Sequence, residues 1–256
     1  MARIFITGSS TGLGLAAAQS LSEDGHEIVL HARNTERAIA LEREIPDAKG
    51  IVTGDLSLLA DVRSVAYQVN ALGPLDAVIH NAGLYGDSGQ GRTAEGHSVM
   101  TAVNILAPYA LTALIARPRR LVFMSSGLHR GGADSLDDID WTQRRWQAAQ
   151  AYADTKLQIV ALAFALAKRW PDVLSNAVDP GWVRTRMGGS SARVDIATGQ
   201  ATQSWLAASD DATALTSGGY WHAMRSETPA APASDPSYQD RLMAELDRLT
   251  GIGLKI

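Results

Sequence analysis

The stretch RIFITGSSTGLG, residues 3–14, decides the fold. Residues 3–7 form a short apolar run rich in β-branched and aromatic side chains, which predicts a strand. Glycines follow in the spacing T-G-x-x-x-G-x-G, and a helical pattern continues over 13–23. Glycines let backbone amides come close to a phosphate, and the helix N-terminus adds partial positive charge. The pattern predicts a pyrophosphate-binding turn, with a plain strand-to-helix connection as the alternative.

Strand and helix patterns alternate along the rest of the chain. This alternation favours a parallel sheet with helices on both faces, which is a doubly wound α/β fold. The predicted strands, about seven in all, cover 3–7, 27–30, 50–53, 77–79, 121–124, 175–178 and 219–222. The predicted helices cover 13–23, 35–44, 58–72, 95–116, 148–169 and 238–249.

Length and composition indicate one globular domain. The 256 residues are 46% hydrophobic and 20% charged, which is typical of a folded chain with a sizeable core. We therefore expect a single domain over residues 1–256. Two segments, 128–147 and 187–211, break the alternation of strands and helices and are predicted to be loops beside the substrate.

Charge, cysteine count and hydropathy argue against several classes of function. The 23 basic and 27 acidic residues are mixed along the chain, so no surface for nucleic acid or a membrane is expected. There are no cysteines, and the six histidines are scattered, so neither a disulfide nor a metal site is predicted. No apolar window suits a signal peptide or a membrane span. We expect a cytoplasmic protein that binds a small molecule.

A tyrosine and a lysine one helical turn apart are the main catalytic candidates. The sequence YADTK places Tyr152 and Lys156 on one face of the predicted helix 148–169. A phenol with an ordinary pKa near 10 is a weak proton donor at neutral pH, and a neighbouring cation lowers that pKa. The pair suits general acid–base chemistry. By itself it also occurs in helices where the tyrosine is a core residue and the lysine is solvated.

Together with the glycine turn, this pair makes the chain resemble the short-chain dehydrogenase/reductase family over nearly its whole length. Further matches follow in the family's order: Asp55-Leu56, Asn81-Ala82-Gly83, Asn104, Ser125-Ser126, Pro180-Gly181 and Thr185. The resemblance implies a single-domain Rossmann-type fold. It also implies an oxidoreductase, of carbonyl reductase type, that moves a hydride between a nicotinamide cofactor and a small-molecule carbonyl or alcohol.

The resemblance assigns four catalytic residues. Tyr152 is then the general acid that protonates the carbonyl oxygen, and Lys156 lowers its pKa and holds the nicotinamide ribose. Ser126 polarises the substrate oxygen, with Ser125 as the alternative. Asn104 supports a water-linked proton path to the lysine.

The resemblance also implies a cofactor site and a preference. Arg33 follows the second predicted strand, where an arginine suits the 2′-phosphate of NADP and an acid would suit the ribose of NAD. NADP (NADPH) is therefore expected, and NAD is the alternative. Asp55 would contact the adenine, and Thr185 the nicotinamide carboxamide. The full implied set is Gly8, Ser10, Thr11, Gly12, Leu13, Gly14, Arg33, Asp55, Leu56, Asn81, Ala82, Gly83, Tyr152, Lys156, Pro180, Gly181, Val183 and Thr185.

The segment 128–147 is longer than the corresponding part of compact family members. Comparable insertions occur in members that resemble retinol dehydrogenases and the WW-domain oxidoreductase, which places the chain in that branch. Trp141 and Trp146 could line an apolar pocket or anchor the segment to the core, and we favour the anchor.

Three further features are expected near the substrate. Trp182 is a third candidate for a pocket wall, and His129 is a hypothetical substrate contact. Residues 187–202 lie where family members carry a lid.

Two other functions remain open from the sequence. One is an NAD-dependent alcohol dehydrogenase, and the other is a non-catalytic dinucleotide-binding sensor. The sensor is disfavoured because the tyrosine, lysine, serine and asparagine are all present. Family members commonly pair through the helices that correspond to 95–116 and 148–169, which makes a homodimer or homotetramer possible.

Overall fold

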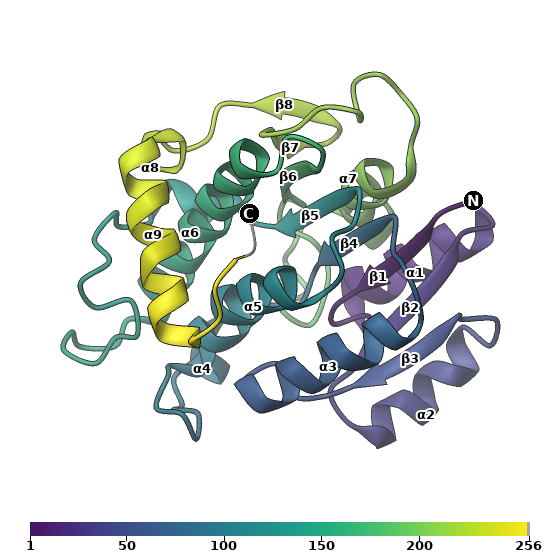
Figure 1. Cartoon of the computed structure of the whole chain (residues 1–256), viewed down its shortest axis with the longest axis horizontal. Coiled ribbons are helices and arrows are strands. Elements are labelled where there is room, and N and C mark those ends of the chain that lie inside the picture. Colours follow the sequence, from purple (N-terminus) through teal and green to yellow (C-terminus); the bar gives the residue numbers. More distant parts are fainter. Residues whose placement is uncertain (255–256) are drawn as a thin grey trace.

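The computed structural model describes residues 1–254, without the side chains of residues 87 and 88, and has a single-domain α/β fold (Figure 1). Its one sheet contains eight strands in the order β3-β2-β1-β4-β5-β6-β7-β8. Neighbouring strands are parallel except for β7 and β8. The predicted domain extends to residue 256, so its last two residues lie outside the described part.

Helices connect the consecutive parallel strands. The strands are β1 Arg3–Ile6, β2 Glu27–Ala32, β3 Gly50–Thr53, β4 Ala77–His80, β5 Arg120–Met124, β6 Leu174–Asp179, β7 Tyr220–His222 and β8 Arg225–Glu227. The helices are α1 Gly12–Glu23, α2 Thr35–Glu44, α3 Leu59–Ala71, α4 Val99–Thr101, α5 Ala107–Leu114, α6 Ala148–Arg169, α7 Ile196–Ala208, α8 Ala231–Ser234 and α9 Pro236–Thr250. Between them lie the 3₁₀ segments η1 Gly86–Gly89 and η3 Gly127–Gly131 and the π-helical η2 Ala102–Leu106. Within residues 1–254, no helix is long and apolar enough to cross a membrane.

The two faces of the sheet each bury an apolar layer. Ile4 and Leu30 belong to the layer under α1, α2 and α7. Phe5 and Phe123 belong to the larger layer under α3, α5 and α6. Side chains alternate between faces along a strand. Because both faces are covered, the central strands appear in the sequence as continuous apolar runs.

The C-terminal part of the chain forms an outer layer over α6 (Figure 1). Tyr238, Leu242 and Leu246 of α9 are buried in the larger core. The hydroxyl of Tyr109 in α5 donates to the carbonyl oxygen of Ile252 at 3.1 Å. The chain therefore covers α5 and α6 with its own C-terminus.

The strand order reverses between β1 and β4, near the middle of the sheet. Ligands of open α/β sheets bind outside the carboxyl ends of the strands at such a reversal. The glycine turn follows β1, Asn81 follows β4 and Ser125 follows β5. The fold thus brings segments that are far apart in the sequence to one edge.

The predicted fold class is confirmed, and the predicted sheet of about seven strands is one strand short. The additional strand is β8, whose three residues are all exposed. Its sequence, Arg-Ser-Glu, has no apolar residue, so no strand pattern marks it.

The helix predicted over 95–116 begins only at Val99, and it contains a π-helical segment before it ends at Leu114. Residues 93–96 form a turn, and Ser98 caps α4 by accepting the N–H of Thr101 at 3.3 Å. The chain then passes through η2 into α5. Pro108 has no backbone N–H, so an α-helical hydrogen bond to the carbonyl of Asn104 cannot form there. The apolar periodicity alone did not indicate this π-helical segment.

The second predicted loop, 187–211, contains the helix α7, which packs on α1 and on the sheet. Its buried face includes Gly199, Thr202 and Gln203. Small and polar residues on a buried face leave no apolar periodicity, which is why the sequence predicted a loop. Residues 196–202 of the predicted lid lie in α7, and the lid over 187–202 stays a prediction.

Candidate active site

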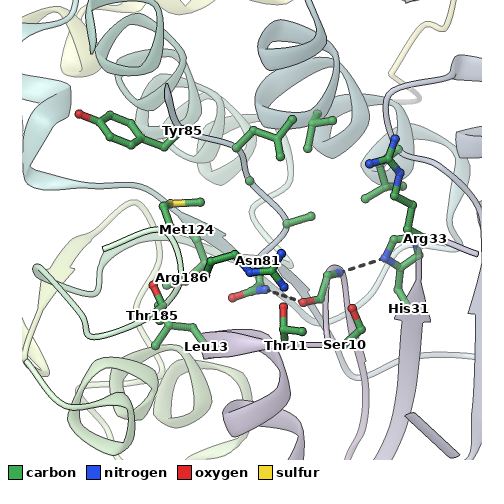
Figure 2. A pocket seen from close by; sticks show the side chains of 18 of the residues that line it. Ser10, Thr11, Leu13, His31, Arg33, Asn81, Tyr85, Met124, Thr185 and Arg186 are labelled. Atoms are coloured by element: carbon green, nitrogen blue, oxygen red, sulfur yellow. Dashed lines mark hydrogen bonds between the residues drawn. The ribbon is translucent and has the colours of Figure 1, made fainter. Parts of the chain in front are cut away.

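A cleft of about 840 Å³ opens at the carboxyl edge of the sheet and brings most of the predicted site residues together (Figure 2). Those that line it are Gly8, Ser10, Thr11, Gly12, Leu13, Arg33, Asp55, Leu56, Asn81, Ala82, Gly83, Tyr152, Lys156, Pro180 and Thr185. Gly14, Asn104, Ser126, Gly181 and Val183 belong to the elements around the cleft rather than to its lining.

The glycine turn has a shape that other residues rarely adopt. Gly8 and Gly12 have φ angles of 65° and 62°, in the left-handed region that favours glycine. A Cβ atom on Gly14 would collide with the amide of Asn81 and the carbonyl of Gly8. The Asn81 amide donates to the carbonyls of Thr7 at 3.0 Å and Gly8 at 3.3 Å. The end of β4 is thereby fixed to the turn after β1.

The N-terminus of α1 faces the cleft and suits an anion. Thr11, its N-cap, makes no side-chain hydrogen bond to the first turn, and the first turn has no acidic residue. The first amides of a helix lack partners within the helix, and the helix dipole adds positive charge there. A dinucleotide pyrophosphate fits this end of the cleft.

His31, which the sequence prediction missed, holds the turn from below. Its Nδ1 accepts the N–H of Gly8 at 3.0 Å, so its Nε2 carries the proton and donates to the carbonyl of Gly54 at 2.9 Å. Burial lowers the pKa of His31, although the carbonyl of Gly54 and the charge of Asp55 oppose this shift. A neutral histidine is what this pair of contacts requires. Its position at the end of β2 was the only signal in the sequence.

Two arginines lie near the far end of the cleft, beyond the glycine turn. Arg33 donates to Asp55 through Nε at 2.8 Å, and its terminal nitrogen lies 2.6 Å from the same oxygen. Burial alone would raise the pKa of Asp55, but hydrogen bonds from Ser57 and Arg33 outweigh it and lower that pKa. Arg37, from the first turn of α2, also lines the cleft. No sequence pattern marks this second cation.

Tyr152 and Lys156 lie at the other end of the cleft, one turn apart in α6. Burial raises the pKa of Tyr152 to about 12, against a hydrogen bond with Ser126 that lowers it. Burial lowers the pKa of Lys156 to about 8. The Lys156 ammonium lies 5.4 Å from the centre of the Tyr152 ring and donates to the carbonyl of Met124 at 2.7 Å. Proton donor and cation are therefore adjacent and buried.

The two serines after β5 have different surroundings. Ser125 is buried, and its hydroxyl donates to the carbonyl of Lys156 at 3.0 Å. Ser126 is the serine that pairs with Tyr152. Ser125 belongs to the cleft lining and Ser126 does not, so the expected substrate contact of Ser126, with Ser125 as the alternative, stays a prediction.

The hypothesis that His129 contacts substrate is wrong. The ring is fully buried, and its Nε2 accepts the N–H of Ala230 at 3.0 Å. Its Nδ1 therefore carries the proton and donates to the carbonyl of Ser126 at 2.8 Å. His129 supports the backbone of Ser126 from behind the cleft.

Asn104 lies in the π-helical η2 and is buried behind the cleft wall. Its side chain accepts the N–H of Leu84 at 2.8 Å and donates to the carbonyl of Leu84 at 3.0 Å. It also donates to the hydroxyl of Thr155 in α6 at 3.1 Å. The side chain of Asn104 thus joins the segment after β4 to the catalytic helix.

The segment after β6 forms one side of the cleft. Gly181 has a φ of 75°, and its N–H donates to Asp179 at 2.9 Å. The hydroxyl of Thr185 accepts the N–H of Gly188 at 3.2 Å. Figure 2 shows the neighbouring Arg186 extending towards Asn81.

The tryptophans of the sequence analysis are not part of the cleft lining in the described chain. Trp141 and Trp146 pack near Met100, Ala151 and Tyr152, so the anchor interpretation fits the structure. The exposed Trp182 donates from Nε1 to the carbonyl of Gly188 at 2.9 Å.

The wall next to Tyr152 is mainly apolar and aromatic. Tyr85 meets the Tyr152 ring edge-on, with 4.8 Å between ring centres. Leu84, Val99, Val103, Met124 and Met187 also line the cleft.

The strand order, the glycine turn and the buried tyrosine–lysine pair define a dinucleotide-binding oxidoreductase fold. A family model described as enoyl-(acyl carrier protein) reductase matches residues 8–214. The chain belongs to the short-chain dehydrogenase/reductase family, whose members bind NAD(P).

Relatives and solved structures agree with this assignment. An uncharacterized oxidoreductase of Emericella nidulans is 41% identical over 259 residues, covering 99% of each chain. The putative daunorubicin C-13 ketoreductase DnrU of a Streptomyces species is 33% identical, covering 95% of this chain and 89% of its own. Human retinol dehydrogenase 13 is 28% identical, covering 97% and 84%.

Two solved structures have the same fold. A putative uncharacterized protein from Mycobacterium paratuberculosis superposes with a TM-score of 0.86 at 24% identity, covering 100% of this chain and 96% of its own. A blue fluorescent protein from a metagenomic library, in complex with NADPH, superposes with a TM-score of 0.69 at 22% identity, covering 86% and 95%.

We expect the variant His31→Phe to lower the free energy of unfolding by about 1–3 kcal/mol, because it leaves the Gly8 N–H and the Gly54 carbonyl without their partner. Urea unfolding followed by circular dichroism measures this change. A free energy equal to that of the wild type would show that these two contacts carry no net stability.

Proposed function

We propose that the protein is an NADP(H)-dependent oxidoreductase that reduces the carbonyl group of a small, largely apolar molecule, or oxidises the corresponding alcohol. One observation carries the proposal: a single cleft has a buried tyrosine–lysine pair at one end and two arginines at the other. The ketoreductase among the relatives is consistent with a carbonyl substrate.

The chain's own residues supply proton transfer and orientation. The bound nicotinamide supplies or accepts the hydride. Tyr152 donates the proton to the carbonyl oxygen, and Ser126 holds that oxygen by a hydrogen bond. With a pKa raised to about 12, the phenol keeps its proton at neutral pH in the free protein. With a pKa of about 8, Lys156 is mostly charged at pH 7, so it favours the phenolate that forms during the reaction.

Asn104 supports this centre from behind. It joins Leu84 to Thr155, the residue next to Lys156. We keep the water-linked proton path through Asn104 as a prediction. Val183, Gly181 and Gly14 do not line the cleft. We propose that they contribute to cofactor binding by shaping the backbone around it.

The preference for NADP rests on charge. Arg33 is largely exposed and shares its charge with Asp55, while Arg37 adds a second guanidinium to the lining. Two guanidinium groups suit a 2′-phosphate, which carries more charge than a ribose hydroxyl. The alternative is an NAD-dependent alcohol dehydrogenase, whose cofactor has a ribose hydroxyl in place of the 2′-phosphate.

Assembly is proposed to be monomeric rather than the homodimer or homotetramer that the family suggests. The helices used for family pairing correspond to α5 and α6, and α8, α9 and the C-terminal residues of the same chain cover them. The cytoplasmic location expected from the sequence stays a prediction.

Light scattering coupled to gel filtration tests the assembly. We expect one species near the chain mass of 27.2 kDa, because the apolar surface of α5 and α6 is already buried. A mass of twice or four times that value at micromolar concentration would contradict the monomer and support the homodimer or homotetramer.

Tyr152→Phe tests the catalytic assignment. We expect about a 10²- to 10⁴-fold lower kcat for NADPH-dependent reduction of aromatic ketones, aldehydes or quinones, because a positioned general acid is lost. The dissociation constant of NADPH, measured by fluorescence, should change little. Tyr67→Phe, an exposed tyrosine on α3, is the control. If wild type and both variants bind NADPH but reduce no carbonyl in the panel, the non-catalytic sensor gains support.

The double variant Arg33→Ala, Arg37→Ala tests the cofactor preference. Charge-assisted hydrogen bonds contribute about 1.5–3 kcal/mol each when desolvated, and these two are partly exposed, so we expect the KM for NADPH to rise about 10- to 100-fold. The KM for NADH should stay within about threefold of the wild-type value, since NADH lacks the phosphate. Arg43→Ala, from the last turn of the same helix, is the control. Equal losses for both cofactors would contradict a 2′-phosphate site.

A further inference from the structure

The catalytic helix α6 begins without an ordinary cap. Gln147, its N-cap residue, makes no side-chain hydrogen bond to the first turn. The amides at a helix start lack partners, and an uncapped end opens readily. Tyr152 lies in the second turn of α6, so its position depends on whatever holds that end.

Asp154, between the tyrosine and the lysine, receives several contacts from the segment before the helix. It is 3% exposed. Its Oδ1 accepts the N–H of Ala133 and the amide of Gln150, each at 2.8 Å. The Gln150 amide also donates to the carbonyl of Gly131 at 2.8 Å. These bonds attach the first turns of α6 to residues 131–133.

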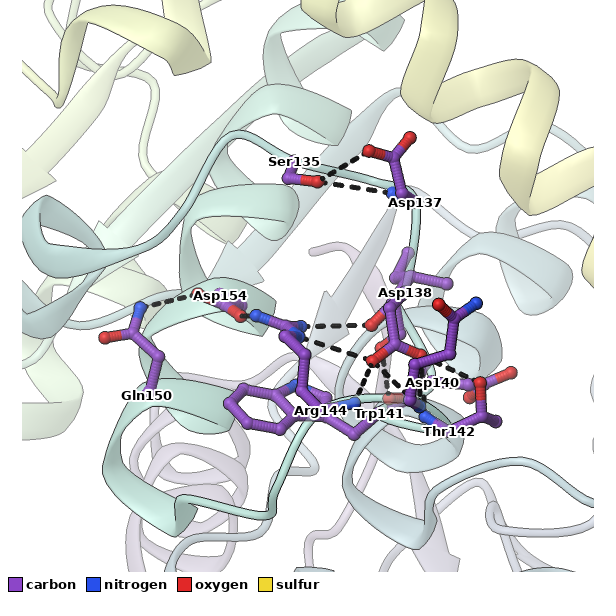
Figure 3. Close-up of polar contacts among 12 residues, drawn as sticks. Ser135, Asp137, Asp138, Asp140, Trp141, Thr142, Arg144, Gln150 and Asp154 are labelled. Carbon is purple, nitrogen blue, oxygen red and sulfur yellow. Dashed lines mark hydrogen bonds and ion pairs between the residues drawn. The ribbon is translucent and has the colours of Figure 1, made fainter.

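Arg144 joins the same carboxylate to a second buried acid (Figure 3). Its terminal nitrogens donate to Asp154 at 3.3 Å and to the carbonyl of Asp138 at 3.0 Å. The Asp138 carboxylate accepts the backbone N–H groups of residues 142–144, the shortest at 2.6 Å. The side chains of Asp154 and Asp138 are 5% and 8% exposed, and that of Arg144 is 35% exposed. Loss of Arg144 would therefore leave the buried carboxylate of Asp154 without this charged partner.

The Arg144 guanidinium also covers the ring of Trp141, 3.8 Å from its centre. Trp141 is buried in one cluster with Met100, Ala151 and Tyr152. Its φ of 55° is in a region that bulky residues rarely adopt and that persists only where the surroundings enforce it. Arg92 donates to the carbonyl of Trp141 at 2.6 Å and thereby holds it from the other side.

We propose that residues 133–146, called the brace below, fix the position of Tyr152 through the Arg144–Asp154 contact, so that Arg144 and Asp154 are positioning residues. The inference rests on the proposed function for its kinetic consequence. It replaces the prediction of a substrate loop over 128–147 with a fixed support behind the catalytic tyrosine. Misplacing a reacting group by about 1 Å can cost roughly 100-fold in rate.

The test compares Arg144→Met with Arg145→Met. Both changes remove one positive charge, but the side chain of Arg145 is exposed and makes no hydrogen bond or ion pair with the described residues. Three quantities are measured for each: kcat and KM for a ketone, the dissociation constant of NADPH, and hydrogen–deuterium exchange of residues 133–156.

For Arg144→Met we expect kcat to fall about 10- to 100-fold, while the NADPH dissociation constant stays within about twofold. Exchange should quicken at 142–144 and also at 148–153, the start of α6. Arg145→Met should match the wild type. We expect Asp154→Asn to lower kcat by a similar factor. In the Arg144→Met background it should lower kcat little further, because both changes remove the same Arg144–Asp154 contact. If Arg144→Met does not fold, Arg144→Lys is measured instead. Lysine keeps the positive charge but cannot donate two hydrogen bonds in the planar geometry of a guanidinium, so we expect kcat to fall by less than the roughly 10- to 100-fold expected for Arg144→Met.

An unchanged kcat in folded Arg144→Met, with faster exchange confined to the brace, would overturn the inference. If the wild type reduces no carbonyl at all, the proposed function fails, and exchange at 148–153 still decides whether the brace holds the start of α6.

Discussion

The side-chain amide of Asn81 binds the carbonyls of Thr7 and Gly8, and this contact joins β4 to β1 at the point where the strand order reverses. The glycine turn can come this close to Asn81 only because Gly14 has no Cβ atom and leaves room for the amide. With the two strand ends fixed together, the amides of α1 face one end of the cleft and the catalytic helix faces the other. The rest of the site is arranged around this junction.

Burial acts on the two catalytic groups in opposite directions. It raises the pKa of Tyr152 and lowers the pKa of Lys156, because both charged forms lose solvation. The free site therefore favours a neutral phenol, and the hydrogen bond with Ser126 works against that preference. A phenol that keeps its proton in the free protein fits the proposed role of Tyr152 as the general acid.

The same scaffold holds these groups from behind with neutral histidines and paired charges. His31 supports the glycine turn and His129 supports the backbone of Ser126, each through one accepted and one donated hydrogen bond. Arg144 lies between two buried carboxylates behind Tyr152. His31 also lines the cleft, whereas His129 and Arg144 are not among its described lining residues. All three are proposed to affect the chemistry through the position of other groups.

By itself the sequence determined the alternation of strands and helices, the glycine turn and the pair Tyr152 and Lys156, because these depend on local periodicity and on short spacings. It did not indicate the π-helical segment before Pro108, the helix α7 with its small and polar buried face, or the polar strand β8. Only the tertiary structure revealed Arg37 in the cleft, the burial of His129 and the contact between Arg144 and Asp154. Those depend on which segments the sheet brings side by side, and residues far apart in the chain carry no local pattern that records it.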